Sequence, residues 1–137
     1  MKHSAQASLE LAIVIAAFLS MFLLLLPSIH ALFDAGIFSF DVKNAQQFLH
    51  SFKETARQLS VFSSGSEKTI ESAVLTKWVI YSKQNRVFLQ VHSEEAGKTK
   101  LLEAELPLTV EMQELELQKE ARLRLVKSSS HVLVVNG

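Results

Sequence analysis

The side chains that could carry metal or nucleophile chemistry are few and scattered in this sequence. There is no cysteine, which excludes disulfides, thiolate metal sites and a cysteine nucleophile. None of the histidines stands in a H-E-x-x-H pair or at another metal-ligand spacing. They are His3, His30, His50, His92 and His131. We therefore expect no metal ion and no cofactor.

Paired glutamates are the remaining candidates for general acid–base chemistry, since no aspartate follows Asp41. The pairs are Glu94 with Glu95, Glu103 with Glu105, and Glu114 with Glu116. We interpret the second and third pairs as solvent-facing residues of strands. The segment SSGSEKT at 63–69 lacks the spacing of a phosphate-binding loop, and no serine-nucleophile motif is present. These observations predict that the protein is not an enzyme.

The charge and hydropathy of the chain are unevenly distributed. Fourteen basic and fourteen acidic residues give no net charge, so nothing suggests a nucleic-acid partner. In contrast, the stretch from Leu11 to Leu26 has no charge and a single hydroxyl, Ser20. Continued through Pro27, this apolar stretch reaches Phe33. About 20 such residues span the hydrocarbon core of a bilayer, so the stretch is long enough to cross a membrane.

Two conventional interpretations of this apolar stretch differ in whether it is retained. A cleaved secretory signal has an apolar region of roughly 7 to 15 residues and small residues at its cleavage site. Here the region is longer, and Ile29 occupies the −3 position of SIHA at 28–31. A signal anchor would keep the helix as a single membrane span. Lys2 is the only basic residue before the span, so charge gives little orientation signal.

Polar residues spaced by two stand immediately before the apolar run: Gln6, Ser8 and Glu10. This Q-x-S-x-E core resembles the class III signal peptide of archaeal type IV pilin-like proteins. The resemblance covers about the first thirty residues. The chain departs from the family pattern in its short leader with one lysine and in Ala5, rather than glycine, before the expected cut. It also lacks Asn-x-Ser/Thr sequons, although many archaeal pilins are N-glycosylated.

The resemblance implies processing by a prepilin peptidase between Ala5 and Gln6, which retains the apolar helix. Assembly would then use an ATPase and a membrane platform protein. The partners would be further copies of this chain or other pilins in a helical filament, with membrane lipid as the environment before assembly. The residues assigned to assembly are Glu10, Leu11, Ile13, Val14, Phe18, Phe22 and Pro27.

Glu10 requires a physical explanation, because a carboxylate within a membrane helix costs roughly a few kcal/mol. The helix dipole offsets part of this cost near the N-terminus. The free α-amine of a neighbouring subunit could offset more and so favour one axial register in a filament. The alternative is that Glu10 lies at the membrane–water interface and benefits only from the dipole.

Beyond Phe33 the pattern becomes amphipathic and predicts that one helix continues from about Gln6 to Phe62. At 1.5 Å per residue it would be on the order of 85 Å long. The apolar stripe comprises Phe33, Ile37, Phe40, Phe48, Phe52, Ala56, Leu59 and Phe62. The side opposite to this stripe comprises Asp41, Lys43, Gln46, Gln47, Lys53, Glu54, Arg57 and Gln58. Pro27 should kink or loosen the helix.

The remainder of the chain predicts an antiparallel sheet of about five or six strands, one face of which packs on the helix. Strands are expected at 73–83 and 86–92 around a Gln84-Asn85 turn, followed by a loop at 94–100. The segment 101–112 alternates, with Pro107 marking an edge or a break. Residues 111–125 have helix-forming composition, yet their leucines fall on odd positions, which favours strands with a turn near Lys119. After a turn at 128–130, residues 131–135 form the last strand.

The sequence thus predicts an α+β protein with a leader at 1–5, a transmembrane or filament-core helix at 6–33, an amphipathic extension at 34–64 and a β-sheet head at 65–137. The expected function is that of a structural subunit of a surface filament, with a role in adhesion. It would reside in the cell membrane before processing and on the cell surface afterwards. The alternative is a single-pass anchored binding module, or an accessory pilin that does not polymerise alone.

Overall fold

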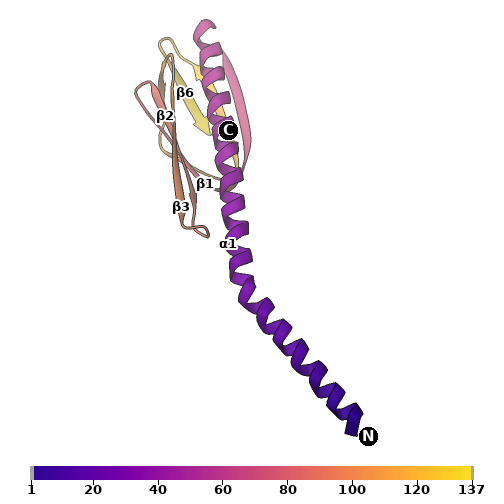
Figure 1. Cartoon of the computed structure of the whole chain (residues 1–137). Helices are drawn as coiled ribbons and strands as arrows, with labels where there is room; N and C mark the ends of the chain where they lie inside the picture. Colours follow the sequence, from indigo (N-terminus) through magenta and orange to yellow (C-terminus); the bar gives the residue numbers. More distant parts are fainter. Residues whose placement is uncertain (1, 137) are drawn as a thin grey trace. The chain divides into compact units, whose positions relative to one another are not determined.

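The computed structural model describes the backbone of residues 2–136 and the side chains of residues 8–136 (Figure 1). It has one helix, α1 (Lys2–Val61), followed by six strands. The strands are β1 (Glu67–Lys83), β2 (Arg86–Ser93), β3 (Lys98–Glu105), β4 (Thr109–Glu111), β5 (Leu115–Lys127) and β6 (His131–Asn136). The predicted α+β class is confirmed. The chain forms two compact units that divide between Ala35 and Gly36.

Helix α1 confirms the predicted long helix, although it begins at Lys2 rather than Gln6 and ends at Val61. Pro27 lies inside the helix and does not end it. The hydroxyl of Ser20 donates to the Ala16 carbonyl at 2.8 Å, so this hydroxyl has a partner within the helix itself. After Val61, a loop containing Gly65 at a φ of 92° leads into the sheet. Glycine adopts this left-handed conformation without steric cost.

The six strands form one sheet with the order β3-β2-β1-β5-β6-β4. All neighbouring pairs are antiparallel except β4 and β6, which are parallel, so the expectation of a fully antiparallel sheet is corrected. The parallel pair arises because the chain breaks at Pro107 after β3 and crosses to the far edge of the sheet. The predicted turns at 84–85 and 128–130 are confirmed. Gln84 adopts a φ of 57° in the first of them.

The main differences from the sequence-based expectation are two strand starts and one turn. Strand β1 begins at Glu67 rather than at residue 73, and β3 begins at Lys98, inside the predicted loop at 94–100. The expected turn near Lys119 is wrong, because β5 runs unbroken through this residue. Lys119 does have a φ of 68°, but it lies opposite an irregularity in β1 instead of reversing the chain. The odd-numbered leucines of β5 point to the core, as predicted.

The core of the second unit lies between the sheet and the helix residues that follow Gly36. From the helix, Phe48, Phe52, Ala56 and Leu59 are buried as predicted. The remaining members of the predicted stripe, Phe33, Ile37, Phe40 and Phe62, are largely exposed. The helix residues that join the core without having been predicted are Ala45, Leu49 and Thr55. From the sheet, Trp78 is fully buried and its ring lies 5.6 Å from that of Phe48.

Asp41 was expected on the side opposite to the apolar stripe, and this expectation is wrong: Asp41 is fully buried. Its carboxylate accepts hydrogen bonds from the backbone N–H groups of Leu75 and Thr76, both at 3.0 Å. It also accepts bonds from the Thr76 hydroxyl and from the indole Nε1 of Trp78, the latter at 2.8 Å. Four donations explain how a carboxylate is accommodated in the core, since a buried charge is tolerated only when it is well hydrogen-bonded.

The donors to Asp41 come from a β-bulge in β1. Val74 pairs with Lys119 and Lys77 pairs with Gln118, so Leu75 and Thr76 have no partner on β5. Their N–H groups would therefore lack acceptors, and a buried N–H without a partner is costly. Asp41 supplies the missing acceptors from the helix. Because the bulge adds two residues, the inward and outward alternation of β1 is the same on both of its sides.

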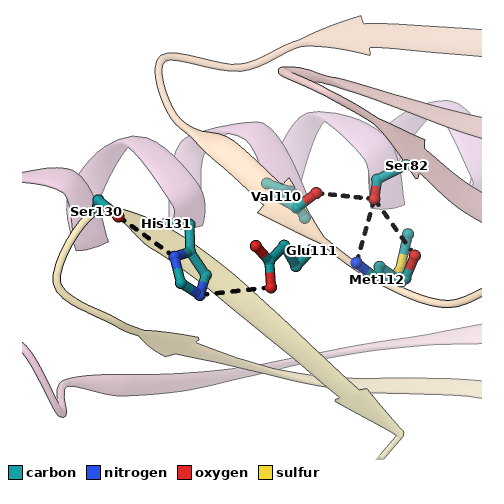
Figure 2. A network of polar contacts seen from close by, with 6 residues as sticks. All are labelled: Ser82, Val110, Glu111, Met112, Ser130 and His131. Atoms are coloured by element: carbon teal, nitrogen blue, oxygen red, sulfur yellow. Dashed lines mark hydrogen bonds and ion pairs between the residues drawn. The ribbon is translucent and has the colours of Figure 1, made fainter.

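The short strand β4 is held by side-chain contacts in addition to its parallel ladder (Figure 2). Ser82 of β1 donates to the carbonyl of Val110 at 2.9 Å, and its hydroxyl accepts the N–H of Met112 at 3.2 Å. On the other side, the imidazole Nε2 of His131 lies 3.6 Å from a carboxylate oxygen of Glu111. Ser82, the Glu111–His131 contact and the ladder to β6 thus together hold the segment that closes the far edge of the sheet.

Replacing Asp41 with alanine should destabilise the second unit by about 3 kcal/mol, because the N–H groups of the bulge and the indole of Trp78 would lose their acceptor. Trp78 is the only tryptophan, so its fluorescence reports unfolding of this core directly. Chemical denaturation of the full chain in detergent micelles provides the measurement.

Asp34→Ala is the matched control, since Asp34 lies in the same helix but before the second unit. This variant should unfold within about 0.5 kcal/mol of the parent chain. Equal stability of the Asp41 and Asp34 variants would show that the carboxylate does not hold the bulge.

Candidate functional site

The first unit presents apolar side chains to its surroundings over its whole described length. Phe18 is 69 % exposed and Leu24 is 79 % exposed, values that belong to surface residues rather than to a core. The predicted assembly residues Leu11, Ile13, Val14 and Phe22 are also exposed. Contiguous apolar surface on this scale marks a membrane or protein interface, because leaving it in water is unfavourable.

Helix α1 contains a segment, beginning at Ser8, whose length and composition are sufficient to cross a membrane, and its most apolar window has no buried residues. This absence of burial distinguishes it from the core helix of a globular domain. The coarse prediction of an N-terminal helix suited to a membrane is therefore supported by length, composition and exposure together.

The structure describes the predicted processing motif only in part. Ala5 and Gln6 lie in the helical backbone of α1, but their side chains are outside the described residues. Ser8 and Glu10 are exposed on the helix surface, at the point where the apolar run begins.

The sheet face that points away from α1 carries pairs of opposite charge across β1 and β5. Lys77 and Glu116 approach to 2.9 Å, and Arg122 lies 2.6 Å from Glu71. The hydrogen bond to Glu71, and then its negative charge, raise the pKa of Arg122 above the ordinary value, so the guanidinium remains charged. Exposed pairs of this kind contribute little stability. They make the part of this face that lies over β1 and β5 polar.

Shallow hollows occur on the second unit, and the predicted pair Glu94 and Glu95 lines one of them together with Ser93. This hollow, of about 320 Å³, is also lined by Ile37 of α1, Leu75 and Lys77 of β1, and His92 of β2. Another, of about 380 Å³, lies between α1 and β3 and is lined by His50 and Glu105 among others. Among the described residues, no three histidine, aspartate or glutamate side chains are arranged to hold a metal ion.

Sequence reasoning missed one feature of this surface. Leu75 belongs to an apolar, β-forming run, yet its side chain is 51 % exposed beside Ile37. The signal for this feature in the sequence is Asp41, which stands at a helical spacing otherwise filled by apolar residues. Buried residues follow it four, seven and eight positions later: Ala45, Phe48 and Leu49. An acid at such a position requires donors from a facing element.

Comparison with known proteins gives no relative: no protein-family model, curated protein or solved structure matches this chain.

Substituting Phe18 by lysine should reduce stable membrane association of the full chain. A lysine near the centre of a membrane helix costs roughly 3 kcal/mol, and the transfer energy of the phenylalanine is lost as well. We expect the fraction retained in membranes after alkaline extraction to fall by at least about tenfold. Gln46→Lys adds the same charge at an exposed position of α1 in the second unit and should leave extraction unchanged. Equal retention of both variants would argue against burial of Phe18 in lipid.

Proposed function

We propose that this chain is a structural subunit of an archaeal type IV pilin-like surface filament, with a role in adhesion. The observation that supports the proposal best is a single juxtaposition. A Q-x-S-x-E motif directly precedes an apolar helical run with exposed side chains, and the same helix later supplies one layer of a folded α+β unit.

Each part has a distinct task in this proposal. The apolar run would reside in the membrane before assembly and in the filament core afterwards. Burial there would draw on dispersion contacts and on removal of apolar surface from water. The second unit would be carried on the filament surface, where its polar sheet face meets solvent.

Prepilin peptidase would act between Ala5 and Gln6, leaving Gln6 as the first residue and Glu10 as the fifth. An assembly ATPase and a membrane platform protein would then move subunits from the bilayer into the filament. The carboxylate of Glu10 would pair with the α-amine of a neighbouring copy, which would set the axial register of the helices.

The competing function is that of a monomeric single-pass anchor carrying a binding unit. It uses the same membrane helix but requires neither trimming nor a carboxylate at position 10. The two functions therefore differ in the chemistry of the N-terminus, which can be measured directly.

The mature chain should begin at Gln6. Mass spectrometry of the protein from membranes of cells that contain a prepilin peptidase provides the test, and the Glu at the fifth mature position is contained in the same N-terminal peptide. A Gln6→Pro variant, which alters the residue after the scissile bond, should retain the leader. A wild-type chain that keeps residues 1–5 in these cells would support the plain anchor.

Glu10→Gln should leave membrane insertion intact and lower filament yield by at least about tenfold, which corresponds to about 1.4 kcal/mol of lost pairing per subunit. Filament yield can be measured in sheared cell-surface fractions, with membrane content quantified in parallel. Glu54→Gln makes the same chemical change in the second unit and should assemble normally. Normal yield with glutamine at position 10 would exclude the electrostatic role of Glu10.

A further inference from the structure

The solvent-facing side of α1 in the second unit carries a row of polar and basic residues. They follow one another at steps of three and four along the helix, so they lie on one side of it, and all of them are exposed. We name this row the basic stripe. Its members are Lys43, Gln46, His50, Lys53 and Arg57. From Val42 to Val61 the only acidic residue of α1 is Glu54, so the stripe gives this side of the helix an excess of positive charge.

Edge strand β3 adds two cations on the side of the sheet that α1 covers. Lys98 pairs with Ser93 and Lys100 pairs with Val91, and both partners are buried. Residues paired across neighbouring strands point to the same face, so both lysines belong to the helix side. An ordinary solvated surface mixes charges of both signs. Here no ion pair joins these two lysines, or the basic residues of the stripe, to a carboxylate within the described part of the chain.

A hollow of about 380 Å³ lies between the basic stripe and β3. Gln46, His50 and Lys53 line it from the helix, so three members of the stripe face one space. Its size falls within the range of small-molecule sites, roughly 300 to 1,000 Å³. Buried or partly buried apolar side chains also line it. They are Leu49, Leu102 and Ala104.

The glutamates of β3 do not cancel the positive charge on the helix side of this hollow. Glu103 and Glu105 line the hollow, and they alternate along β3 with Ala104. Ala104 pairs with the buried Val87 and so points to the helix side. Successive side chains of a strand point to opposite faces, so both glutamates belong to the other face of the sheet. The charged side chains that α1 contributes to the hollow are therefore basic.

This combination of groups matches an acidic sugar polymer. Lysine and arginine attract carboxylate or sulfate groups, and the amide of Gln46 and the imidazole of His50 can bond to hydroxyl groups. The apolar lining can cover the C–H faces of sugar rings. From Lys43 to Arg57 the stripe extends on the order of 21 Å, at 1.5 Å per residue, which suits a linear polymer rather than one small anion.

Single-stranded nucleic acid, the other common polyanion, requires a different surface. Proteins that bind it stack its bases on exposed aromatic side chains. The aromatic residues of α1 between Lys43 and Arg57 are Phe48 and Phe52, and both are buried in the core. The stripe thus offers charge and hydrogen-bonding groups without a stacking platform.

We propose that the groove between the basic stripe and β3 binds an acidic polysaccharide. Lys53 and Arg57 contact its anionic groups, and Gln46 and His50 contact its hydroxyls. This inference names a ligand class for the adhesive role proposed above and rests on that proposal for its use at the cell surface. Binding itself requires neither filament assembly nor removal of residues 1–5.

The test titrates the full-length chain in detergent micelles with labelled polygalacturonate, at low ionic strength where charges are least screened. Neutral dextran and duplex DNA are titrated in parallel. Polygalacturonate should bind, dextran should not, and DNA should bind more weakly than polygalacturonate. Changing Lys53→Gln together with Arg57→Gln should weaken polygalacturonate binding at least about tenfold, because two charge-assisted contacts are lost.

The matched control removes the same charge elsewhere. Lys83→Gln together with Arg86→Gln changes two exposed bases at the β1–β2 turn, outside the groove, and should alter the affinity less than about twofold. Gln46→Leu keeps the charge and removes the amide, so it should weaken polygalacturonate binding about threefold and leave DNA binding unchanged. Denaturation followed by Trp78 fluorescence reports whether each variant keeps its core.

Equal losses from the two double variants would overturn this inference, as would tighter binding of DNA than of polygalacturonate or an unchanged affinity with Gln46→Leu. Either result leaves the filament proposal standing, because filament yield is measured separately. Conversely, polygalacturonate binding by a chain that forms no filaments would support the groove and contradict the filament proposal.

Discussion

The hydrogen bonds that the Asp41 carboxylate accepts are the interaction on which the second unit depends. They join the helix to the central strand β1 at the point where the β1–β5 ladder is interrupted. Apolar contacts between helix and sheet are nondirectional and would tolerate sliding by a turn or a strand pair. A carboxylate that must meet two adjacent N–H groups and one indole tolerates only one register. Asp41 therefore specifies how the helix lies on the sheet, and the surrounding core supplies most of the stability.

This arrangement separates two uses of apolar surface within one helix. Residues after Gly36 bury a helical stripe against the sheet, with Phe52 and Leu59 fully or almost fully inaccessible. Residues before it show the opposite condition, with large apolar side chains exposed all around the helix. The first condition is satisfied within the chain, whereas the second can be satisfied only by lipid or by other chains. In the proposed function, lipid satisfies the second condition before assembly and other copies of the chain satisfy it afterwards.

The two edges of the sheet are protected from pairing with another sheet in different ways. Strand β3 is an open edge that carries Lys98, Lys100, Glu103 and Glu105, and such charges disfavour pairing with another sheet. The opposite edge ends in β4, a strand of three residues pinned by Ser82 and by the ladder to β6. Both devices discourage contact through sheet edges. Association between copies through helices, as proposed, is compatible with such protected edges.

The sequence by itself determined the elements that depend on local pattern. Uniform hydropathy and helical spacing defined α1, and alternation with turn residues located most strands, including the odd-numbered leucines of β5 and the break at Pro107. The spacing of Gln6, Ser8 and Glu10 before the apolar run is likewise visible without a structure, and the filament proposal starts from it. The tertiary structure alone decided the features that depend on residues distant in the chain. The burial of Asp41, the bulge at Leu75 and Thr76, the unbroken path of β5 through Lys119 and the parallel pairing of β4 with β6 all follow from contacts between separate elements. Local propensity cannot show that an aspartate on a helix will meet unpaired N–H groups of a strand more than thirty residues later, because the stabilising partner exists only after the helix and sheet have packed.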